Sequence, residues 1–216
     1  MKKTIVLMSD NHSNWNVDVP DGDIFIHCGD WSYTGSLQSL VKFNDFLGRL
    51  PHKHKLYIPG NHELGFEQNY NLYQDTITNG TNINGQTLEI DGLRFFGCSY
   101  TPSYGRWAFM ADDDQRKRYW ETLSPDTVDV LITHGPAFGL ADQAIPDESE
   151  HLGCIHLRKY VERVTPKVFA HGHIHGSGGM ITPLKHWEGE PDTICANVSV
   201  MNEKYKVVRP ATVIEV

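Results

Sequence analysis

Five apolar segments of the sequence each run directly into a residue that can bind a metal ion or transfer a proton. The segments are IVLMSDNH, IFIHCGDW, KLYIPGNHE, VLITHGP and VFAHGHIH, and their polar residues are Asp10, His12, Asp30, Asn61, His62, His134, His173 and His175. In open α/β sheets, ligands bind at the carboxyl ends of the strands. If the five segments are neighbouring strands, these side chains are predicted to converge on one pocket.

The chemistry of this set favours a metal site. Apart from His62, it holds two carboxylates, four imidazoles and one amide, a mixture of oxygen and nitrogen donors that suits borderline or harder divalent ions. Cysteine is not in the set, which argues against a structural zinc site. Each residue alone would be ordinary in a core or on a surface, so the prediction rests on their joint occurrence at strand ends.

The segment FAHGHIHGSGG, residues 169–179, places His171, His173 and His175 two positions apart. On an extended strand all three side chains would point to one face, because side chains alternate with period two. The glycines within and after this segment instead favour a strand that ends in a loop. The three histidines therefore need not share one role.

The elements that must position these residues follow an alternating pattern. We expect strands at 4–8, 23–27, 55–58, 93–97, 128–132, 167–171, 193–198 and 211–216, several of them continuous apolar runs typical of strands buried on both faces. Residues 37–50 predict a helix that packs on a sheet through Leu37, Leu40, Val41, Phe43, Leu47 and Leu50. Further helices are predicted at 112–123, which begins with acidic residues, and at 154–164. The predicted fold class is α/β with mixed sheets.

The composition predicts a soluble globular chain with a single domain over residues 1–216, because 39% hydrophobic residues suffice for a full core. No segment approaches the roughly 18 apolar residues of a membrane span, and the opening MKKTIVLMSD is interpreted as a first strand. A net charge of -8 should repel nucleic-acid polymers and anionic membranes, so neither is expected as a partner. The cysteines are widely spaced, which favours reduced thiols over disulfides; they are Cys28, Cys98, Cys154 and Cys195. Because thiols stay reduced in the cytoplasm, a cytoplasmic location is expected.

The motifs resemble the signature of the calcineurin-like metallophosphoesterase superfamily. They are DNH at 10–12, GD at 29–30, GNHE at 60–63, a lone histidine at 134 and GHIH at 172–175. Each motif alone is weak, but five in order over nearly the whole chain make a strong joint signal. Within the superfamily, FNDFLGRLP, GNHELGF, THGPAFG, HLGC and GHIHGSGG are similar to the animal metallophosphoesterase-domain-containing proteins of the brain type. The resemblance implies an α/β fold with a two-sheet mixed β sandwich flanked by helices.

The resemblance also implies two divalent metal ions that are bridged by Asp30. The remaining ligands of the first ion would be Asp10, His12 and His175, and those of the second ion would be Asn61, His134 and His173. Two such ions roughly 3.5–4 Å apart need a bridging anion, which a carboxylate on a rigid strand supplies. Manganese is the first expectation, with iron, zinc or nickel as alternatives. His171 lies before the motif and is expected to bond to the backbone.

The implied reaction is hydrolysis of a small phosphoester, either a phosphodiester or a phosphomonoester such as a nucleotide. A hydroxide between the metal ions would attack phosphorus in line, and His62 would protonate the leaving oxygen as general acid. The chain has GDWSYTG where protein phosphatases of the superfamily have GDxVDRG, which disfavours a phosphoprotein substrate. The alternative is a non-catalytic metal-binding scaffold of the same fold, against which the retained His62 argues. The oligomeric state stays open.

Other polar residues have simpler interpretations. His52 and His54 in PHKHK are expected in a solvated loop, and RKR at 116–118 on a helix surface. Two alternatives remain for Arg106 and Trp107. Arginine can bind phosphate through its planar fork and tryptophan can stack on a base, but a loop packed on the core explains both residues as well.

Overall fold

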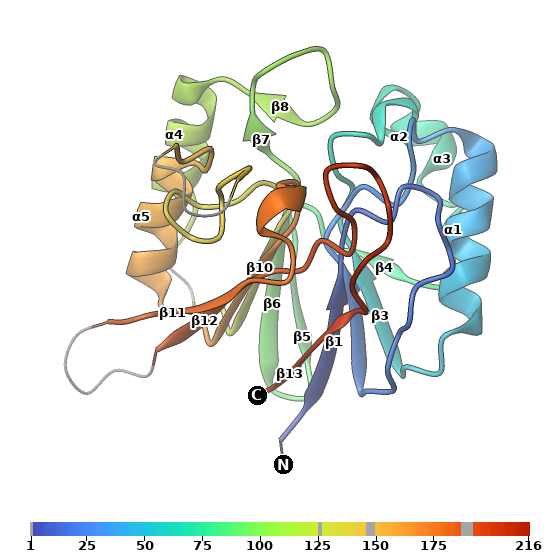
Figure 1. Ribbon diagram of the computed structural model, residues 1–216, viewed down its shortest axis with the longest axis horizontal. Helices are drawn as coiled ribbons and strands as arrows, with labels where there is room; N and C mark the ends of the chain where they lie inside the picture. Colours follow the sequence, from blue (N-terminus) through green and yellow to red (C-terminus); the bar gives the residue numbers. More distant parts are fainter. Residues whose placement is uncertain (1, 125–126, 146–149, 187–191) are drawn as a thin grey trace.

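The computed structural model describes residues 2–124, 127–145, 150–186 and 192–216, and it places two β-sheets face to face (Figure 1). The first sheet has the strand order β13-β1-β2-β3-β4. Its central strands β1, β2 and β3 run parallel, and β13 joins β1 antiparallel at the edge. The bounds of its strands are β1 Thr4–Met8, β2 Ile24–His27, β3 His54–Tyr57, β4 Thr81–Asn82 and β13 Thr212–Glu215.

The second sheet has the order β11-β12-β10-β9-β6-β5, with parallel strands at its centre and antiparallel pairs at both edges. Its strands are β5 Thr87–Ile90, β6 Leu93–Cys98, β9 Val130–Thr133, β10 Val168–His171, β11 Ile181–Leu184 and β12 Thr193–Asn197. A separate two-stranded ribbon consists of β7 Thr101–Pro102 and β8 Met110–Ala111.

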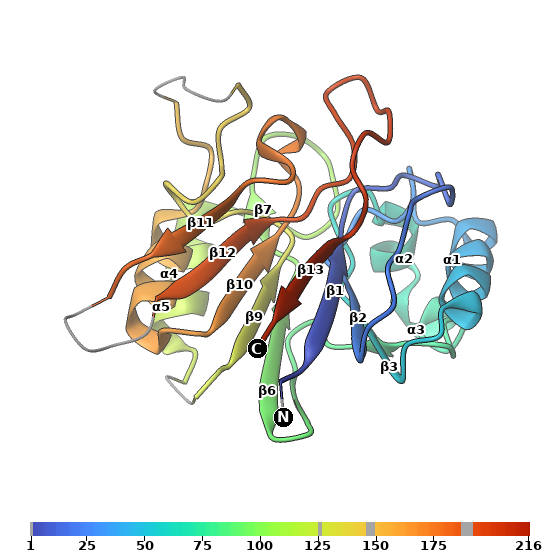
Figure 2. The same cartoon turned by 60° about the horizontal axis from the view of Figure 1, so that its bottom comes forward.

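Helices cover the outer faces of the two sheets, which Figures 1 and 2 show from two directions. The first sheet carries α1 Leu37–Arg49, α2 Leu64–Gln68 and α3 Tyr70–Tyr73, and the second carries α4 Asp113–Thr122 and α5 Ile155–Val164. A 3-10 helix, η1, follows β10 at His175–Ser177. The predicted two-sheet mixed sandwich flanked by helices is confirmed. Among the described residues, every helix is too short or too polar to cross a bilayer.

Alternate residues of each central strand contribute to different hydrophobic cores, which explains the continuous apolar runs in the sequence. On β1, Ile5 and Leu7 belong to the core between the sheets, whereas Val6 and Met8 belong to the core under α1. On β10, Val168 lies in the core between the sheets. The central strands are therefore buried on both sides, and the polar residues of the predicted site follow at their ends.

The helix predicted at 37–50 is present, but two of its residues were assigned to the wrong face. Leu37 and Val41 are 47% and 46% exposed, while Phe46 is 4% exposed and packs on the first sheet. At about 100° per residue, Leu40, Phe43 and Phe46 fall on one stripe centred on Phe43, and Leu37 and Val41 lie about a third of a turn or more from that centre. The spacing was close to helical, but the stripe is centred elsewhere.

All eight predicted strand segments form strands to within two residues of the expected bounds. The prediction missed the short or polar strands β4, β5, β7, β8 and β11 and the short helices α2 and α3. These elements bury few side chains; for example, none of the residues in α3 is buried. A hydrophobic pattern cannot reveal elements that contribute so little to the core.

Candidate metal centre

The carboxyl ends of five parallel strands bring the predicted site residues together. In the first sheet β1, β2 and β3 lie side by side, and in the second sheet β9 and β10 do the same. The loops after these strands meet at the upper edge of the sandwich in Figure 1. Hydrogen bonds tie these loops together: Asp10 N–H donates to the carbonyl of Gly29 at 3.0 Å, and Gly172 N–H donates to that of His134 at 3.1 Å.

The backbone is strained where the strands give way to these loops. The φ angles of Asp10, His12, Asp30 and His173 are 59°, 39°, 57° and 69°, all in the left-handed region that non-glycine residues seldom adopt. Each such residue costs on the order of 1–3 kcal/mol, and this kind of strain clusters at functional sites. The strained turns redirect four polar side chains into one space.

Two glycines let other backbone segments approach the carboxylates closely. A Cβ atom on Gly60 would lie 2.3 Å from Asp30 Oδ1, and one on Gly172 would lie 2.3 Å from Asp10 Oδ2. Only glycine therefore fits at these two positions, because any side chain would collide with a carboxylate. The glycines of the GNHE and GHIH motifs allow the strand-end loops to close around the acidic residues.

The first cluster consists of Asp10, His12 and His175, whose ligand atoms lie within 4.8 Å of one another. His12 Nδ1 lies 3.2 Å from the carbonyl of Ser32, and His175 Nδ1 lies 3.2 Å from that of Asn202. A carbonyl can only accept, so each Nδ1 carries the proton and the neutral ring leaves Nε2 with its lone pair. The two Nε2 atoms lie 3.3 Å apart, which is the arrangement that a shared cation fits.

The second cluster centres on the side-chain oxygen of Asn61. Asn61 Oδ1 lies 2.9 Å from His134 Nε2 and 2.8 Å from His173 Nδ1. The amide nitrogen donates to Tyr104 Oη at 3.2 Å, which turns the amide oxygen toward the histidines. His134 Nδ1 donates to the carbonyl of Cys28 at 2.9 Å, so its Nε2 is the atom left to bind a cation.

Asp30 lies between the two clusters. Its Oδ1 is 3.4 Å from His134 Nε2, and its Oδ2 is 3.8 Å from His12 Nε2. One oxygen therefore faces each cluster, an arrangement that allows the carboxylate to bridge two ions. The residues fit a pair of divalent ions: oxygen and neutral nitrogen donors converge, and backbone carbonyls outside the clusters fix the orientation of three of the four imidazoles.

The electrostatics of the site also favour positive charge. Burial alone would raise the pKa of Asp10, but its hydrogen bond with His175 and the charges of the histidines outweigh burial and hold this pKa well below its usual range. The pKa of Asp30 is lowered in the same way, chiefly by His134. Burial opposes protonation of His134, yet Asp30 raises its pKa to about 9. Two buried carboxylates thus attract a cation, either a proton or a metal ion.

The side chain of His62 is 11% exposed and lines a cavity. Its Nδ1 donates to the carbonyl of Tyr33 at 3.1 Å, so Nε2 faces the site, 4.0 Å from Asp30 Oδ2. The ring stacks on Trp107 with centroids 4.5 Å apart and meets His12 edge-on at the same distance. This geometry holds Nε2 toward the space above Asp30.

Glu63 is a buried site residue that the sequence interpretation missed. Its carboxylate accepts hydrogen bonds from the backbone N–H groups of Asp30 at 2.9 Å, Gly60 at 2.7 Å and Ser32 at 3.0 Å. Burial, reinforced by the charge of Asp30, raises the pKa of Glu63, while the hydrogen bonds from Gly60 and Ser32 oppose this rise by stabilising the carboxylate. The position of Glu63 directly after His62 in GNHE could have revealed its role. A buried carboxylate in a tight turn needs hydrogen-bond donors, and the backbone N–H groups of the turn are the nearest ones.

The remaining histidine predictions have mixed outcomes. His171 is buried and bonds to the backbone carbonyl of Leu140 at 2.9 Å, as expected. His52 contradicts the prediction of a solvated loop, since it is 2% exposed and packs on Phe25 with ring centroids 5.6 Å apart. His54 begins β3. His52 thus packs beside a buried strand. The neighbouring lysines in PHKHK had suggested a solvated loop instead.

The basic segment at 116–118 is only partly a helix surface. Lys117 and Arg118 are exposed, but Arg116 is 9% exposed and donates to the carbonyl of Ala111 and to Asp113.

Trp107 packs against His62 and not in the core, with 39% of its surface exposed, and Arg106 is exposed. Trp107 therefore belongs to the site, through His62.

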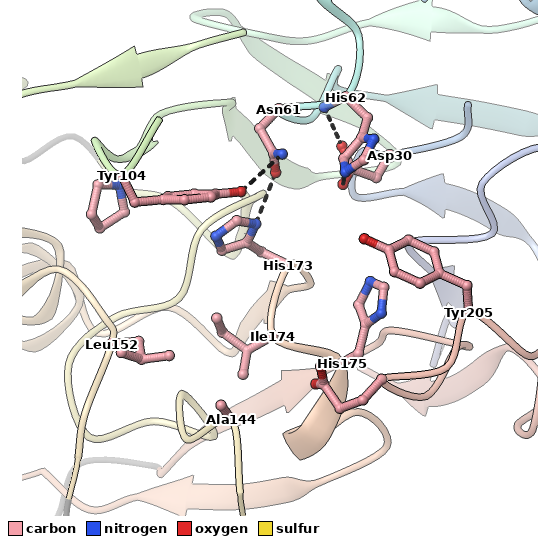
Figure 3. A pocket seen from close by; sticks show the side chains of 12 residues that line it. Asp30, Asn61, His62, Tyr104, Ala144, Leu152, His173, Ile174, His175 and Tyr205 are labelled. Atoms are coloured by element: carbon pink, nitrogen blue, oxygen red, sulfur yellow. Dashed lines mark hydrogen bonds and ion pairs between the residues drawn. The ribbon is translucent and has the colours of Figure 1, made fainter. Parts of the chain in front are cut away.

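A cavity of about 350 Å³ opens beside the two clusters (Figure 3). Its polar side holds Asp30, Asn61, His62, His173 and His175. Its other side is apolar, and Figure 3 shows Ala144, Leu152 and Ile174 on the side away from Asp30. A small ligand could contact the candidate metal centre and this apolar side at once.

Known proteins share sequence similarity with most of this chain. The model of the calcineurin-like phosphoesterase family matches residues 3–177, which include all the predicted ligands. The UPF0046 protein K07C11.7 of Caenorhabditis elegans is 39% identical over 193 residues, covering 82% of this chain and 65% of that protein. Metallophosphoesterase domain-containing protein 1 of Homo sapiens is 32% identical over 235 residues, covering 97% of this chain and 70% of that protein.

A solved structure, TT1561 of Thermus thermophilus, has a similar fold with a TM-score of 0.58. It is 13% identical, and the similarity covers 93% of this chain and 92% of that one. The chain spans about two thirds of the length of the curated relatives it matches. The family match and the identity to these relatives show that the chain belongs to the calcineurin-like phosphoesterase family, whose chemistry is metal-dependent hydrolysis of phosphoesters.

Proposed function

We propose that the protein hydrolyses phosphodiesters or small phosphomonoesters, such as nucleotides, at a dinuclear metal centre. One observation carries the proposal: the two oxygens of Asp30 face two separate groups of nitrogen and oxygen donors, at 3.4 Å from His134 Nε2 and 3.8 Å from His12 Nε2. A single structural ion would not need a carboxylate with a histidine cluster on each side.

The proposed first site holds Asp10, His12 and His175 together with Asp30. The proposed second site holds Asn61, His134 and His173, again with Asp30. Manganese is the preferred ion, with iron, zinc or nickel as alternatives, because the donors mix carboxylate, amide and imidazole without thiolate. When bound, such ions neutralise charge on phosphoryl oxygens and lower the pKa of an attacking water.

His62 is the proposed general acid. The carbonyl of Tyr33 fixes the proton on Nδ1, and the stack on Trp107 holds the ring with Nε2 toward the cavity. A protonated His62 in this position can donate its Nε2 proton to the leaving oxygen of a substrate that lies above Asp30. The histidines of the two clusters are proposed metal ligands, with nitrogens that face one another or Asn61, so they are not proposed as the acid.

A small phosphoester is the proposed partner, and the cytoplasm is the proposed location. All four cysteines are buried and unpaired, which supports a reducing compartment. The overall charge of -8 supports local binding of phosphate at the metal centre over binding of a nucleic-acid polymer to the surface.

The proposal is tested by measuring turnover of bis-p-nitrophenyl phosphate and p-nitrophenyl phosphate after chelation and after addition of manganese, iron, zinc or nickel. We expect the chelated protein to be inactive and one added metal to restore hydrolysis. A protein that binds two ions and turns over neither substrate with any of the four metals would instead be a metal-binding scaffold.

A further inference from the structure

We propose that the cavity selects substrates whose single phosphoryl group carries an uncharged aromatic group, and that this group binds on the apolar side of the cavity. This inference rests on the proposed function, which places the phosphoryl group at the candidate metal centre. The apolar side, which we call the apolar wall, consists of Pro102, Ala144, Leu152 and Ile174.

The apolar wall is open to a ligand. Leu152 is 37% exposed although it lines a cavity, so its side chain has surface available for a binding partner. Ile174 comes between two predicted ligands, His173 and His175, and links the wall to the metal centre. In Figure 3 Leu152, Ile174 and Ala144 lie together across the cavity from Asp30. A phosphoryl group at the metal centre would therefore direct its substituent toward these side chains.

Two tyrosines supply aromatic surface at the same place. Tyr104 lies 5.5 Å from His173 between ring centroids, and Tyr205 lies 5.2 Å from His175. Each proposed metal site thus has an aromatic ring beside one of its histidines. The tyrosines are 59% and 45% exposed, so both retain free surface. Aromatic pairs gain stability beyond the area they bury, which favours a flat ring as the occupant of the cavity.

The charges around the cavity exclude a second anionic group. Among the described residues that line it, none is lysine or arginine, and the charged residue beyond the metal centre is Glu203. A second phosphate would therefore face an apolar wall and a carboxylate. The bound ions would be the source of positive charge, and they would already be engaged by the first phosphoryl group. Polyphosphates should therefore bind less well than monophosphates with a neutral ring.

The test compares binding of phenylphosphonate and methylphosphonate to the manganese-loaded protein by isothermal titration calorimetry. Both ligands place one phosphonate on the ions, and they differ in the group that meets the apolar wall. We expect phenylphosphonate to bind on the order of tenfold to hundredfold more tightly. With 4-carboxyphenylphosphonate, which adds a negative charge to the ring, most of this gain should be lost.

The matched variants are Leu152→Glu in the apolar wall and Leu72→Glu on α3, where Leu72 is 73% exposed and does not line the cavity. The ratio of the two dissociation constants cancels any general change in metal affinity. Leu152→Glu should bring the ratio down to about one, whereas Leu72→Glu should leave it unchanged. Equal affinities for the two ligands in the parent protein, or a preference that survives Leu152→Glu, would overturn the inference.

Turnover of bis-p-nitrophenyl phosphate on the same samples separates this inference from the proposed function. A protein that prefers phenylphosphonate but has no hydrolytic activity would contradict the proposed function and support the cavity assignment. A protein that hydrolyses the diester but does not prefer phenylphosphonate would support the proposed function and overturn the cavity assignment.

Discussion

His12 Nε2 and His175 Nε2 lie 3.3 Å apart, although 163 positions separate the two residues in the chain. Each ring donates its Nδ1 proton to a backbone carbonyl, that of Ser32 or that of Asn202. Two bare nitrogen lone pairs are therefore held toward each other by groups outside the site. Such an arrangement is stable when a positive charge lies between the rings, so the fold prepares the first metal site in advance.

Asp30→Ala should remove both metal ions, because each oxygen of Asp30 faces one of the two clusters. His173→Gly should instead weaken only the second site, since the side chain of His173 contacts Asn61, while its backbone N–H, which donates to Asp10, is kept by glycine. Metal content is measured by mass spectrometry on protein purified in limiting manganese. Asp91→Ala serves as control, because Asp91 lies at the surface and pairs with Lys3.

Loss of a single ion from Asp30→Ala would contradict the bridging role. Two retained ions in both variants would show that the ligand assignment is wrong.

His62→Ala should lower kcat by on the order of 10²–10⁴ for esters with nucleoside or alkoxide leaving groups. The loss should be much smaller for p-nitrophenyl esters, because nitrophenolate leaves without a proton. Metal content should stay near that of the parent, since His62 is not a proposed ligand. Rates on both kinds of ester are measured with metal analysis of the same samples.

Equal losses on the two kinds of ester, with metals retained, would exclude the proton-donor role of His62. Undiminished activity on both would move the general acid to another residue.

Glu63→Gln should weaken the metal centre without touching a ligand. The carboxylate of Glu63 accepts three backbone hydrogen bonds that fix Asp30 and Gly60, and the amide nitrogen of glutamine would face one or more of these donors. We expect a loss of about 1–3 kcal/mol in the free energy of unfolding and about 10- to 100-fold weaker metal binding. Urea unfolding and metal titration are compared with Glu121→Gln, an exposed residue of α4. Unchanged metal affinity would show that Glu63 does not position Asp30.

The stability of the metal-free protein should depend on the protonation of His27. Burial lowers the pKa of His27 to about 3 from an ordinary value of 6.5, because the ring is enclosed between Asn11 and the N–H of Gly29. The neutral ring therefore contributes its full stability above pH 6.5, and this contribution is lost as the pH falls toward 3. At pH 5 the loss is about 2 kcal/mol relative to pH 7.

Urea unfolding at pH 7 and pH 5 measures this loss, and His27→Gln provides the comparison. Glutamine keeps a donor for Asn11 but does not titrate, so the fall in stability between the two pH values should be smaller by about 2 kcal/mol. An equal fall in both proteins would assign the acid sensitivity to other groups.

The sequence was sufficient to predict the central strands and the residues at their ends. β1 and β10 are buried on both faces, so their apolar runs stand out, and polar residues such as Asp10 and His173 follow where each apolar run ends. The partners that orient the site could not be predicted in the same way. Ser32 and Asn202 contribute backbone carbonyls, which any residue type would supply.

Contacts that depend on loop geometry could not be predicted from the sequence either. Trp107 stacks on His62 from a loop 45 positions away, and Tyr205 reaches His175 from a turn near the C-terminus. Neither residue lies in a periodic segment or a metal-binding motif. Their positions follow from how the loops pack above the two sheets, and local sequence pattern carries no information about that packing.

Binding of two metal ions, one on either side of Asp30, is the basis of the proposed function. Crystals grown with manganese and measured at a wavelength where manganese scatters anomalously test it most directly. We expect two anomalous peaks about 3.5–4 Å apart, one beside His12 and His175 and the other beside His134 and His173, with Asp30 contacting both. A single peak, or two peaks that do not share Asp30, would contradict it.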